Sequence, residues 1–380
     1  MDISTIKPVK TAIIGCGAIS DIFFTNFTKR FKIIDLVKCY SRSGAEEKSE
    51  KYGVPVSSLE GILEDPEIEL VVNLTPPSQH YAIIKAALEA GKHVFTEKVI
   101  AQDFDSIKEL RDLANEKGLY LCSEPDHFMG SSWQCARQLI DGGIIGDVTS
   151  ASVTISQNIG VTIDRARFVS EPAGGIGHDF GIYPVTHLVS LLGPAEEVCG
   201  IMTTQQPLRK HKEITSPVFG KESAYTNEDT VNAAILFKSG VTASLTILGN
   251  SVLEAPDQFT VFGSSGAISL PLAGLFSGDT KLYRAGSFEP VLFPSAHAFD
   301  HDSRGVGAAE MAWSIRLGRR PRAHADLGLH CFEIIDGIEK SFKTHQFYKL
   351  TTTVERPAPL PQGYRGIPGL SYNEEGSLVF

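Results

Sequence analysis

The sequence predicts an α/β protein: a doubly wound parallel sheet comes first, followed by an α+β domain with a large, mostly antiparallel open sheet. Three observations predict this class. Short apolar runs alternate with helical patterns up to about residue 128, which is typical of a parallel sheet covered on both faces. A glycine-rich turn follows the first apolar run. Beyond residue 128, strands joined by tight turns dominate, which indicates antiparallel pairing.

The first segment contains five predicted strands separated by amphipathic helices. The strands are expected at 11–14, 36–40, 70–74, 93–96 and 120–122, and the helices at 18–29, 44–52, 80–89 and 103–117. Apolar residues recur at helical spacing in the last of these helices. Regular alternation of this kind implies right-handed crossovers between parallel strands.

The second segment begins with a helix expected at 131–141 and continues as a sheet. Its strands are predicted at 150–155, 197–202, 230–237, 241–248, 259–262 and 267–270, followed by helices at 305–317 and 327–342. We therefore predict domains at 1–128 and 129–356, and an extended tail rich in proline and glycine at 357–380. A broad sheet with helices on one side exposes a face that another subunit usually covers. We expect a homo-oligomer: a dimer, tetramer or hexamer.

Composition restricts the function classes. The 380 residues carry a net charge of -10, and an acidic surface repels phosphate backbones, so no nucleic-acid partner is expected. The apolar runs are too short to span a bilayer, and no secretory signal is visible. The six cysteines form no C-x-x-C pair, so we expect free thiols in the cytoplasm and no metal site.

The glycine turn after the first strand reads Gly15-Cys16-Gly17-Ala18-Ile19-Ser20. Gly15 permits a tight turn, and Gly17 lets the backbone approach a pyrophosphate at the positive N-terminus of the following helix. The third glycine of the Rossmann pattern is replaced by Ser20. An ordinary strand-to-helix turn also uses glycine. This turn, however, joins the first strand to the first helix of an alternating domain, which predicts NAD(H) or NADP(H) binding by Gly15, Gly17, Ala18 and Ile19.

The end of the second strand leaves the choice between the two cofactors open. NAD enzymes normally carry an acidic residue there, but the stretch from Cys39 to Ser43 contains none. Ser41 and Arg42 are the candidate adenosine ligands. Arg42 either holds the 2′-phosphate of NADP or stacks on adenine, which suits both cofactors; the alternative is a solvated surface arginine.

Four segments together resemble the glucose-fructose oxidoreductase/inositol dehydrogenase (Gfo/Idh/MocA) family. They are the glycine turn, Asn73-Leu74-Thr75-Pro76-Pro77 with His80, the stretch from Ala90 to Lys98, and the stretch from Gly174 to Tyr183 with His187. The resemblance covers about residues 10 to 355. It points to a branch acting on sugars or glycosides, whose neighbours include microbial enzymes that oxidise the third ring carbon of a glycoside.

The resemblance implies a catalytic lysine at position 98. The family signature Glu-Lys-Pro reads Glu97-Lys98-Val99 here, which puts the geometry of the loop in question more than its chemistry. A lysine whose pKa is lowered to about 7–8 can hold the reacting hydroxyl of the substrate. The implied nicotinamide-side contacts are Thr75, Pro76, His80 and Glu97.

Further site residues are expected in the second segment and at the domain junction. Asp179, Tyr183 and His187 are spaced four apart, which would place them on one face of a single helix. The resemblance suggests Tyr183 or His187 as the proton relay and Asp179 as a substrate ligand. Candidate substrate contacts are His178, Asp126 and His127. The alternatives are a solvated helix face and a capped loop.

The activity expected is reversible oxidation of a hydroxyl of a sugar, glycoside or inositol to a ketone. The alternative is an NAD-dependent glycoside hydrolase that works by transient oxidation and elimination. A non-catalytic sensor ranks last because Lys98 is present. Tight binding of the cofactor is a further alternative, because an enzyme that alternates between two sugars would never release its NAD.

Overall fold

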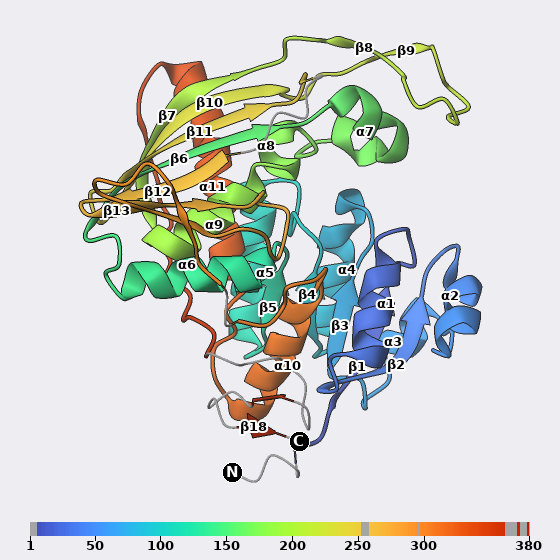
Figure 1. Ribbon diagram of the computed structural model, residues 1–380. Helices are drawn as coiled ribbons and strands as arrows, with labels where there is room; N and C mark the ends of the chain where they lie inside the picture. Colours follow the sequence, from blue (N-terminus) through green and yellow to red (C-terminus); the bar gives the residue numbers. More distant parts are fainter. Residues whose placement is uncertain (1–5, 252–257, 295–296, 362–370, 373–377, 380) are drawn as a thin grey trace. The chain divides into compact units, whose positions relative to one another are not determined.

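The computed structural model describes residues 6–251, 258–294, 297–361, 371–372 and 378–379, and the chain divides into two compact units (Figure 1). The first unit comprises residues 1–134, 296–328 and 357–380, and the second comprises 135–295 and 329–356. The units interleave along the chain because α10 (Val306–Leu317) packs against two strands of the N-terminal sheet. The predicted domain boundaries stay a prediction, which limited proteolysis of the chain would test.

The first unit is built on a five-stranded parallel sheet with the order β2-β1-β3-β4-β5. Chain order reverses between β1 and β3, which is the arrangement of a doubly wound Rossmann sheet. The sequence prediction of this fold class is confirmed. The strands are β1 (Val9–Ile14), β2 (Ile34–Tyr40), β3 (Leu70–Asn73), β4 (His93–Thr96) and β5 (Leu121–Ser123).

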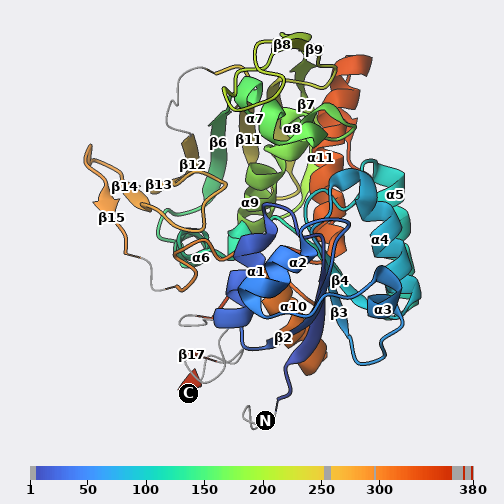
Figure 2. The ribbon, with the colours of Figure 1, turned by 90° about the vertical axis from the view of Figure 1, so that its right-hand side faces the viewer.

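Helices cover both faces of this sheet (Figure 2). One face carries α1 (Ser20–Lys29) and α10, and the opposite face carries α4 (Pro77–Glu89) and α5 (Phe104–Glu116). The unit also contains α2 (Ala45–Tyr52), α3 (Leu59–Leu63) and the short helix η2 (His127–Met129). The central strand β3 is buried along its whole length, and β1 and β4 are buried except at Lys10 and His93, as expected for a parallel sheet covered on both faces.

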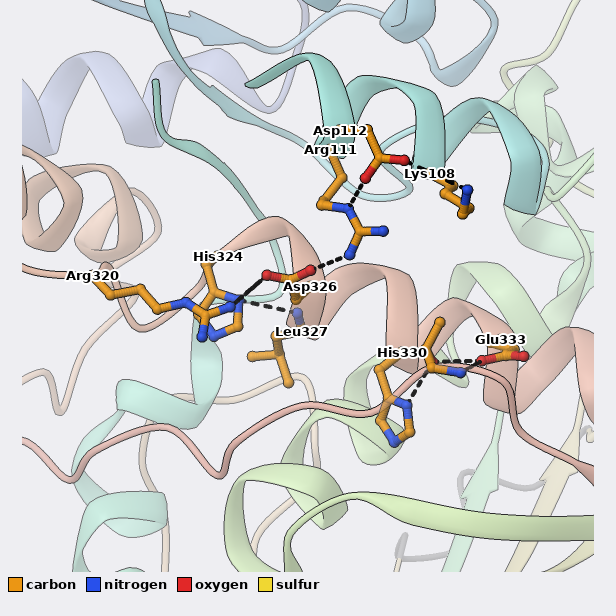
Figure 3. Close-up of polar contacts among 10 residues, drawn as sticks. Lys108, Arg111, Asp112, Arg320, His324, Asp326, Leu327, His330 and Glu333 are labelled. Atoms are coloured by element: carbon orange, nitrogen blue, oxygen red, sulfur yellow. Dashed lines mark hydrogen bonds and ion pairs between the residues drawn. The ribbon is translucent and has the colours of Figure 1, made fainter. Parts of the chain in front are cut away.

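An ion cluster ties α5 to the segment at 320–327 within the first unit (Figure 3). Asp326 accepts hydrogen bonds from Arg111 on α5 and from Arg320, and His324 lies 3.7 Å from the same carboxylate. The cluster joins parts of the chain more than 200 residues apart in the sequence. It therefore helps to hold the C-terminal segments of this unit against the N-terminal sheet.

The second unit contains a nine-stranded sheet with the order β15-β14-β13-β12-β6-β11-β10-β7-β16. All its pairs are antiparallel except β6 with β11, which confirms the predicted mostly antiparallel sheet. A separate antiparallel pair is formed by β8 (Leu208–Lys210) and β9 (Glu222–Ala224). The nine strands are β6 (Val148–Ser156), β7 (Ala195–Thr203), β10 (Thr230–Phe237), β11 (Thr242–Leu248), β12 (Gln258–Gly263), β13 (Gly266–Leu270), β14 (Lys281–Arg284), β15 (Val291–Leu292) and β16 (Tyr348–Lys349).

One face of this large sheet is apolar and is covered by helices. Along β6, Ala151, Val153 and Ile155 are buried, while Ser152 and Thr154 between them are only half-buried. The helix α8 (Ile176–Asp179) contacts β10 and β11 on the covered side. The remaining helices are α6 (Ser131–Asp141), α7 (Ile159–Arg165), η3 (Arg167–Ser170), α9 (Ile182–Leu192) and α11 (Ala325–Thr344).

Only part of the predicted tail at 357–380 is described. Residues 357–361 form neither helix nor strand, and β17 (Ser371–Tyr372) pairs with β18 (Leu378–Val379). The remaining tail positions, 362–370, 373–377 and 380, lie outside the described residues. Across the described part of the chain, no helix combines the length and the apolar character needed to cross a bilayer.

Candidate active site

The carboxyl ends of the five parallel strands lie in one row in the first unit. The registers pair Ile14 with Tyr40 and with Asn73, Asn73 with Thr96, and Thr96 with Ser123. Ligands of doubly wound sheets bind outside this edge, at the point where the strand order reverses. The candidate cofactor residues and Lys98 directly follow these strand ends, so the structure gathers them along one edge.

The glycine turn after β1 packs tightly on the backbone after β3. Gly15 has a φ of 106°, and a Cβ on it would lie 2.6 Å from the carbonyl carbon of Leu74 and 2.7 Å from the amide nitrogen of Thr75. A side chain at this position is excluded by both conformation and space. Gly15 therefore allows β1 and the loop after β3 to meet at the reversal point.

The next three residues of the turn present exposed backbone ahead of α1. Gly17, Ala18 and Ile19 are exposed, and a Cβ on Gly17 would meet no heavy atom within 4 Å. Ser20 is buried, and its hydroxyl donates to the carbonyl oxygen of Gly17 at 2.6 Å. An open loop at a helix N-terminus fits the pyrophosphate of a dinucleotide. These residues therefore fit NAD(H) or NADP(H).

The turn after β2 lies close to the glycine turn. Ser41 is half-buried and Arg42 is exposed. Gly44 in the same turn has a φ of 80°, and a Cβ on it would lie 3.1 Å from the carbonyl oxygen of Cys16. An exposed guanidinium beside the phosphate loop can meet either the adenosine phosphate or the adenine ring.

A hydrogen-bond network fixes the loops after β3 and β4 to each other. Asn73 donates from Nδ2 to Thr96 Oγ1 at 3.0 Å, and its Oδ1 accepts from the Thr75 hydroxyl at 2.7 Å. His80 lies with Nδ1 2.6 Å from the carbonyl oxygen of Val99 and Nε2 2.7 Å from that of Thr75. Burial lowers the pKa of His80. With its ring held by two backbone carbonyls, His80 braces the two loops from behind.

Lys98 lies two residues beyond the end of β4, next to this braced segment. Its backbone nitrogen donates to Glu97 Oε2 at 3.2 Å, and the Glu97 nitrogen donates to the carbonyl oxygen of Asn73 at 2.9 Å. Both side chains are half-buried. The Lys98–Val99 peptide bond is cis. The position gives the ammonium group a fixed backbone at the cofactor edge, as a catalytic lysine needs.

Asp126 and His127 follow β5 at the same edge, and both are fully buried. Asp126 Oδ2 accepts from the backbone nitrogens of Gly305 at 3.0 Å and Gly307 at 2.9 Å, which anchors the start of α10. A residue that contacts a substrate directly would lie on an open loop, whereas both of these side chains are buried. Their predicted role as substrate ligands stays a prediction.

In the second unit, the predicted single helix through Asp179, Tyr183 and His187 was wrong. Asp179 ends α8, whereas Tyr183 and His187 belong to α9. The helices are separated at Gly181, where a Cβ would lie 2.3 Å from the carbonyl oxygen of Gly177. Asp179 is almost fully buried and Tyr183 is half-buried.

His187 lies in the core of the second unit. Its Nε2 lies 2.7 Å from the carbonyl oxygen of Ala273, and its ring packs edge-on against Phe259. Burial lowers the pKa of His187 to about 3, so the ring is neutral at physiological pH. A group that stays neutral and buried is poorly suited to carry protons during a reaction.

Glu228 organises the glycine-rich loop before α8. Its Oε1 accepts from the Gly177 nitrogen at 2.9 Å and lies 3.6 Å from His178 Nδ1. A Cβ on Gly175 would lie 2.0 Å from the same carboxylate. Burial alone would raise the pKa of Glu228, but the nearby His178 and the hydrogen bond from the Gly177 nitrogen lower it below its usual value.

Sequence reasoning missed three residues around these predicted positions: Asn73, Glu124 and Glu228. Asn73 interrupts the apolar run from Leu70 to Leu74, and a polar residue at the end of a buried strand was the available signal. Glu124 stands two positions before the candidate Asp126 in the sequence. Glu228 lies about 50 residues from the loop that it holds, so only the fold reveals it.

Comparison with known proteins gives two matches to family models. The oxidoreductase family with an NAD-binding Rossmann fold matches residues 9–124, and the GFO/IDH/MocA C-terminal domain matches residues 133–269. Together they cover most of the chain.

Curated relatives and solved structures agree with these matches. An uncharacterized oxidoreductase of Schizosaccharomyces pombe is 28% identical over 207 residues, which cover 53% of this chain and 56% of the relative. The match thus spans about half the length of that relative. A dTDP-3,4-didehydro-2,6-dideoxy-alpha-D-glucose 3-reductase of Streptomyces violaceoruber is 29% identical, covering 76% of this chain and 93% of the relative. A levoglucosan dehydrogenase solved with NADH and L-sorbose shares the fold, with a TM-score of 0.78 at 19% identity over 90% of this chain and 99% of that one.

Proposed function

The chain belongs to the Gfo/Idh/MocA family of oxidoreductases, and from that premise we propose that it oxidises a hydroxyl of a sugar, glycoside or inositol to a ketone, reversibly. The observation that carries the proposal is the position of Lys98. It follows β4 at the edge that carries the glycine turn, and the Asn73 and His80 network fixes its loop. The relative from Streptomyces violaceoruber is named as a 3-reductase of a dTDP-linked sugar, which supports this substrate class.

The residues of this chain have separate roles in the proposed reaction. The nicotinamide, when bound, accepts the hydride from the carbinol carbon. Gly15, Gly17, Ala18 and Ile19 hold the pyrophosphate. The further proposed cofactor contacts are Ser41, Arg42, Thr75, Pro76 and Glu97, with His80 supporting Thr75 through its backbone carbonyl.

Lys98 is the proposed acid–base group. Its nitrogen accepts the proton of the substrate hydroxyl as the hydride leaves, and it returns that proton in the reverse direction. We propose Asp179 as a substrate ligand and Tyr183 as the proton relay. The burial of His187 favours a structural role for it instead. His178, held near Glu228, stays a secondary substrate contact.

The narrower assignments are expectations of the same proposal. A glycoside oxidised at its third ring carbon is one expected substrate. Arg42 can serve either cofactor, so titration with NAD(H) and with NADP(H) would measure which of the two the protein prefers. Small carbohydrate-like molecules are the proposed partners, with a homo-oligomeric assembly in the cytoplasm.

The proposal is tested by replacing Lys98. We expect Lys98→Ala to abolish turnover on a panel of polyols and glycosides while the affinity for NAD(P)H, measured by nucleotide fluorescence, stays within about twofold. The control is Lys85→Ala, which removes a half-buried lysine paired with Glu109 on the same unit and should leave turnover unchanged.

The same panel separates the two candidate reactions. Net formation of NAD(P)H with a ketone product supports the dehydrogenase. Release of the aglycone without net redox change identifies the hydrolase that works by transient oxidation. Turnover that survives Lys98→Ala would overturn the assignment of the lysine in both cases.

A further inference from the structure

The turn after β5 brings three ionisable side chains together inside the first unit. Glu124, Asp126 and His127 are 4%, 0% and 0% exposed. One ligand-type atom from each of the three lies within 4.8 Å of those of the other two. Charged groups are rarely buried this deeply without compensation. The catalytic roles proposed above account for none of the negative charge that the two carboxylates bring.

The backbone satisfies only half of the carboxylate oxygens. Glu124 Oε2 accepts from the Asp126 nitrogen at 2.7 Å, and Asp126 Oδ2 accepts from two backbone nitrogens near residue 305. Among the described residues, Glu124 Oε1 and Asp126 Oδ1 are buried oxygens that lack a hydrogen-bond partner. Leaving a buried charged oxygen without a partner is strongly unfavourable, because its hydration is lost and nothing replaces it. The two carboxylate oxygens would therefore be stabilised by a positively charged or protonated neighbour.

The distances to the imidazole fit an ion better than a hydrogen bond. His127 Nδ1 lies 3.7 Å from Asp126 Oδ1 and 3.8 Å from Glu124 Oε2. These separations exceed hydrogen-bond length. Ligand atoms bound at 2.0–2.2 Å to one divalent ion lie roughly 3.3–3.8 Å apart, depending on the bond angle. Small movements of the side chains would thus suffice to close a coordination sphere.

The competing explanation is a proton shared by the two carboxyl groups. Burial, together with the charge of Asp126, raises the pKa of Glu124, so a proton can be retained there. A proton, however, joins only two oxygens. A divalent ion neutralises both carboxylates and also takes the imidazole nitrogen, so it accounts for the meeting of all three groups.

We propose that Glu124, Asp126 and His127 form a binding site for one divalent transition-metal ion. Two carboxylates with one imidazole suit zinc, manganese, iron(II) or cobalt, whereas magnesium and calcium prefer sites made of oxygen alone. The site replaces the expectation of no metal, which rested on the spacing of the cysteines. It would fix the turn after β5 and the start of α10, beside the edge that carries Lys98.

The site is tested by metal uptake, without any need for turnover. The purified full-length chain is stripped with a chelator, dialysed against Co²⁺, and analysed for bound metal and for visible absorption. We expect one equivalent of Co²⁺ and a raised melting temperature. Glu124→Gln and His127→Ala should each weaken the binding at least about tenfold.

A matched control comes from an exposed carboxylate–imidazole pair in the same unit. His301 Nδ1 lies 2.8 Å from Asp300, and both side chains are well exposed. His301→Ala should leave Co²⁺ uptake unchanged. This comparison separates a built site from general surface binding.

X-ray absorption of the loaded wild-type protein keeps the test decisive if the variants fold poorly. Nitrogen and oxygen ligands alone support the proposal. Sulfur ligands would place the ion on cysteines and overturn it. Failure to take up one equivalent, or uptake that the two folded variants do not weaken, would also overturn it and favour the shared proton. Neither result affects the test of Lys98, because metal uptake and turnover are measured separately.

Discussion

At the scale of single residues, the two glycines of the first turn have different physical reasons to be glycine. Gly15 has a left-handed backbone, and a Cβ on it would meet the backbone of residues 74 and 75. Gly17 has no neighbour within 4 Å of the position where a Cβ would stand. The fold of the chain therefore demands the first glycine, whereas no contact within the chain demands the second, which we have proposed as part of the phosphate site.

This difference predicts opposite results for two alanine substitutions. Gly15→Ala should lower the free energy of unfolding by about 2 kcal/mol or more, because it combines an unfavourable φ with a backbone clash. Gly17→Ala should change stability by less than about 0.5 kcal/mol but weaken NAD(P)H binding at least about tenfold. Urea denaturation and fluorescence titration measure the two quantities. Equal nucleotide affinity in Gly17→Ala and the wild type would remove this residue from the proposed phosphate site.

At the scale of elements, the glycine-rich start of α8 is held by a residue far away in the sequence. Glu228 precedes β10 and accepts the hydrogen bond from the Gly177 nitrogen. Its carboxylate occupies the space that a side chain at residue 175 would need. The loop that leads to Asp179 and Tyr183 is thus shaped by an acid that touches neither of them directly. We regard Glu228 as a positioning residue.

Replacing Glu228 should affect substrate recognition more than cofactor binding. Glu228→Ala leaves the buried Gly177 nitrogen unsatisfied and is expected to cost about 1–3 kcal/mol of stability. It should also raise the KM for the substrate at least about tenfold while NAD(P)H affinity stays unchanged. Glu228→Gln keeps an acceptor and should restore part of the loss. The exposed Glu222 on β9 provides the control, since Glu222→Ala should change neither quantity. A KM unchanged in Glu228→Ala would leave this residue with a structural role only.

The elements predicted correctly from the sequence are those with a strong local signal. The five parallel strands and their helices follow from apolar periodicity, and the turn at Gly15 follows from its glycines. The break at Gly181 was missed because only the approach of the Gly177 carbonyl makes it necessary. The parallel pairing of β6 with β11 joins residues about 90 positions apart, so no local pattern could indicate it.

The predicted site divides in the same way. Lys98 and the residues of the glycine turn lie at strand ends, and a strand end can be located from periodicity alone. The surroundings of a side chain cannot be inferred from periodicity. The sequence indicated His187 as a candidate proton relay and His80 as a cofactor contact, but tertiary packing buries both rings against backbone carbonyls. Burial depends on residues that are distant in the chain, so a spacing pattern does not reveal it.

At the scale of the whole molecule, buried histidines link stability to pH. Burial is the main cause of a lowered pKa at each of six histidines in the described part of the chain. The pKa falls to about 3 for His187. It falls to about 4 for His93, His324 and His330. The pKa of His80 and that of His297 are also lowered. These rings are neutral in the folded protein at pH values where the unfolded chain binds protons.

The sign of the effect follows from proton counting. As the pH falls below the ordinary histidine pKa of about 6.5, the unfolded chain takes up protons that the folded protein does not. The stability that these histidines contribute is therefore complete above about pH 6.5 and is lost as the pH falls toward about 4. The carboxyls of Asp126 and Glu124 act in the opposite direction, since burial raises the pKa of Asp126 to about 6 and also raises that of Glu124. Two such groups offset only part of the effect of six.

We therefore expect the free energy of unfolding to fall between about pH 6.5 and about pH 4.5, by about 1.4 kcal/mol per pH unit for each histidine that stays neutral. Urea denaturation across this range measures the slope. His330 makes the single-site test, because its ring lies against the Ala195 nitrogen and the Thr352 hydroxyl. His330→Gln should reduce the slope by about one proton, whereas the exposed His301→Gln should leave it unchanged. A stability that is constant over this range would show that the buried rings accept protons without unfolding.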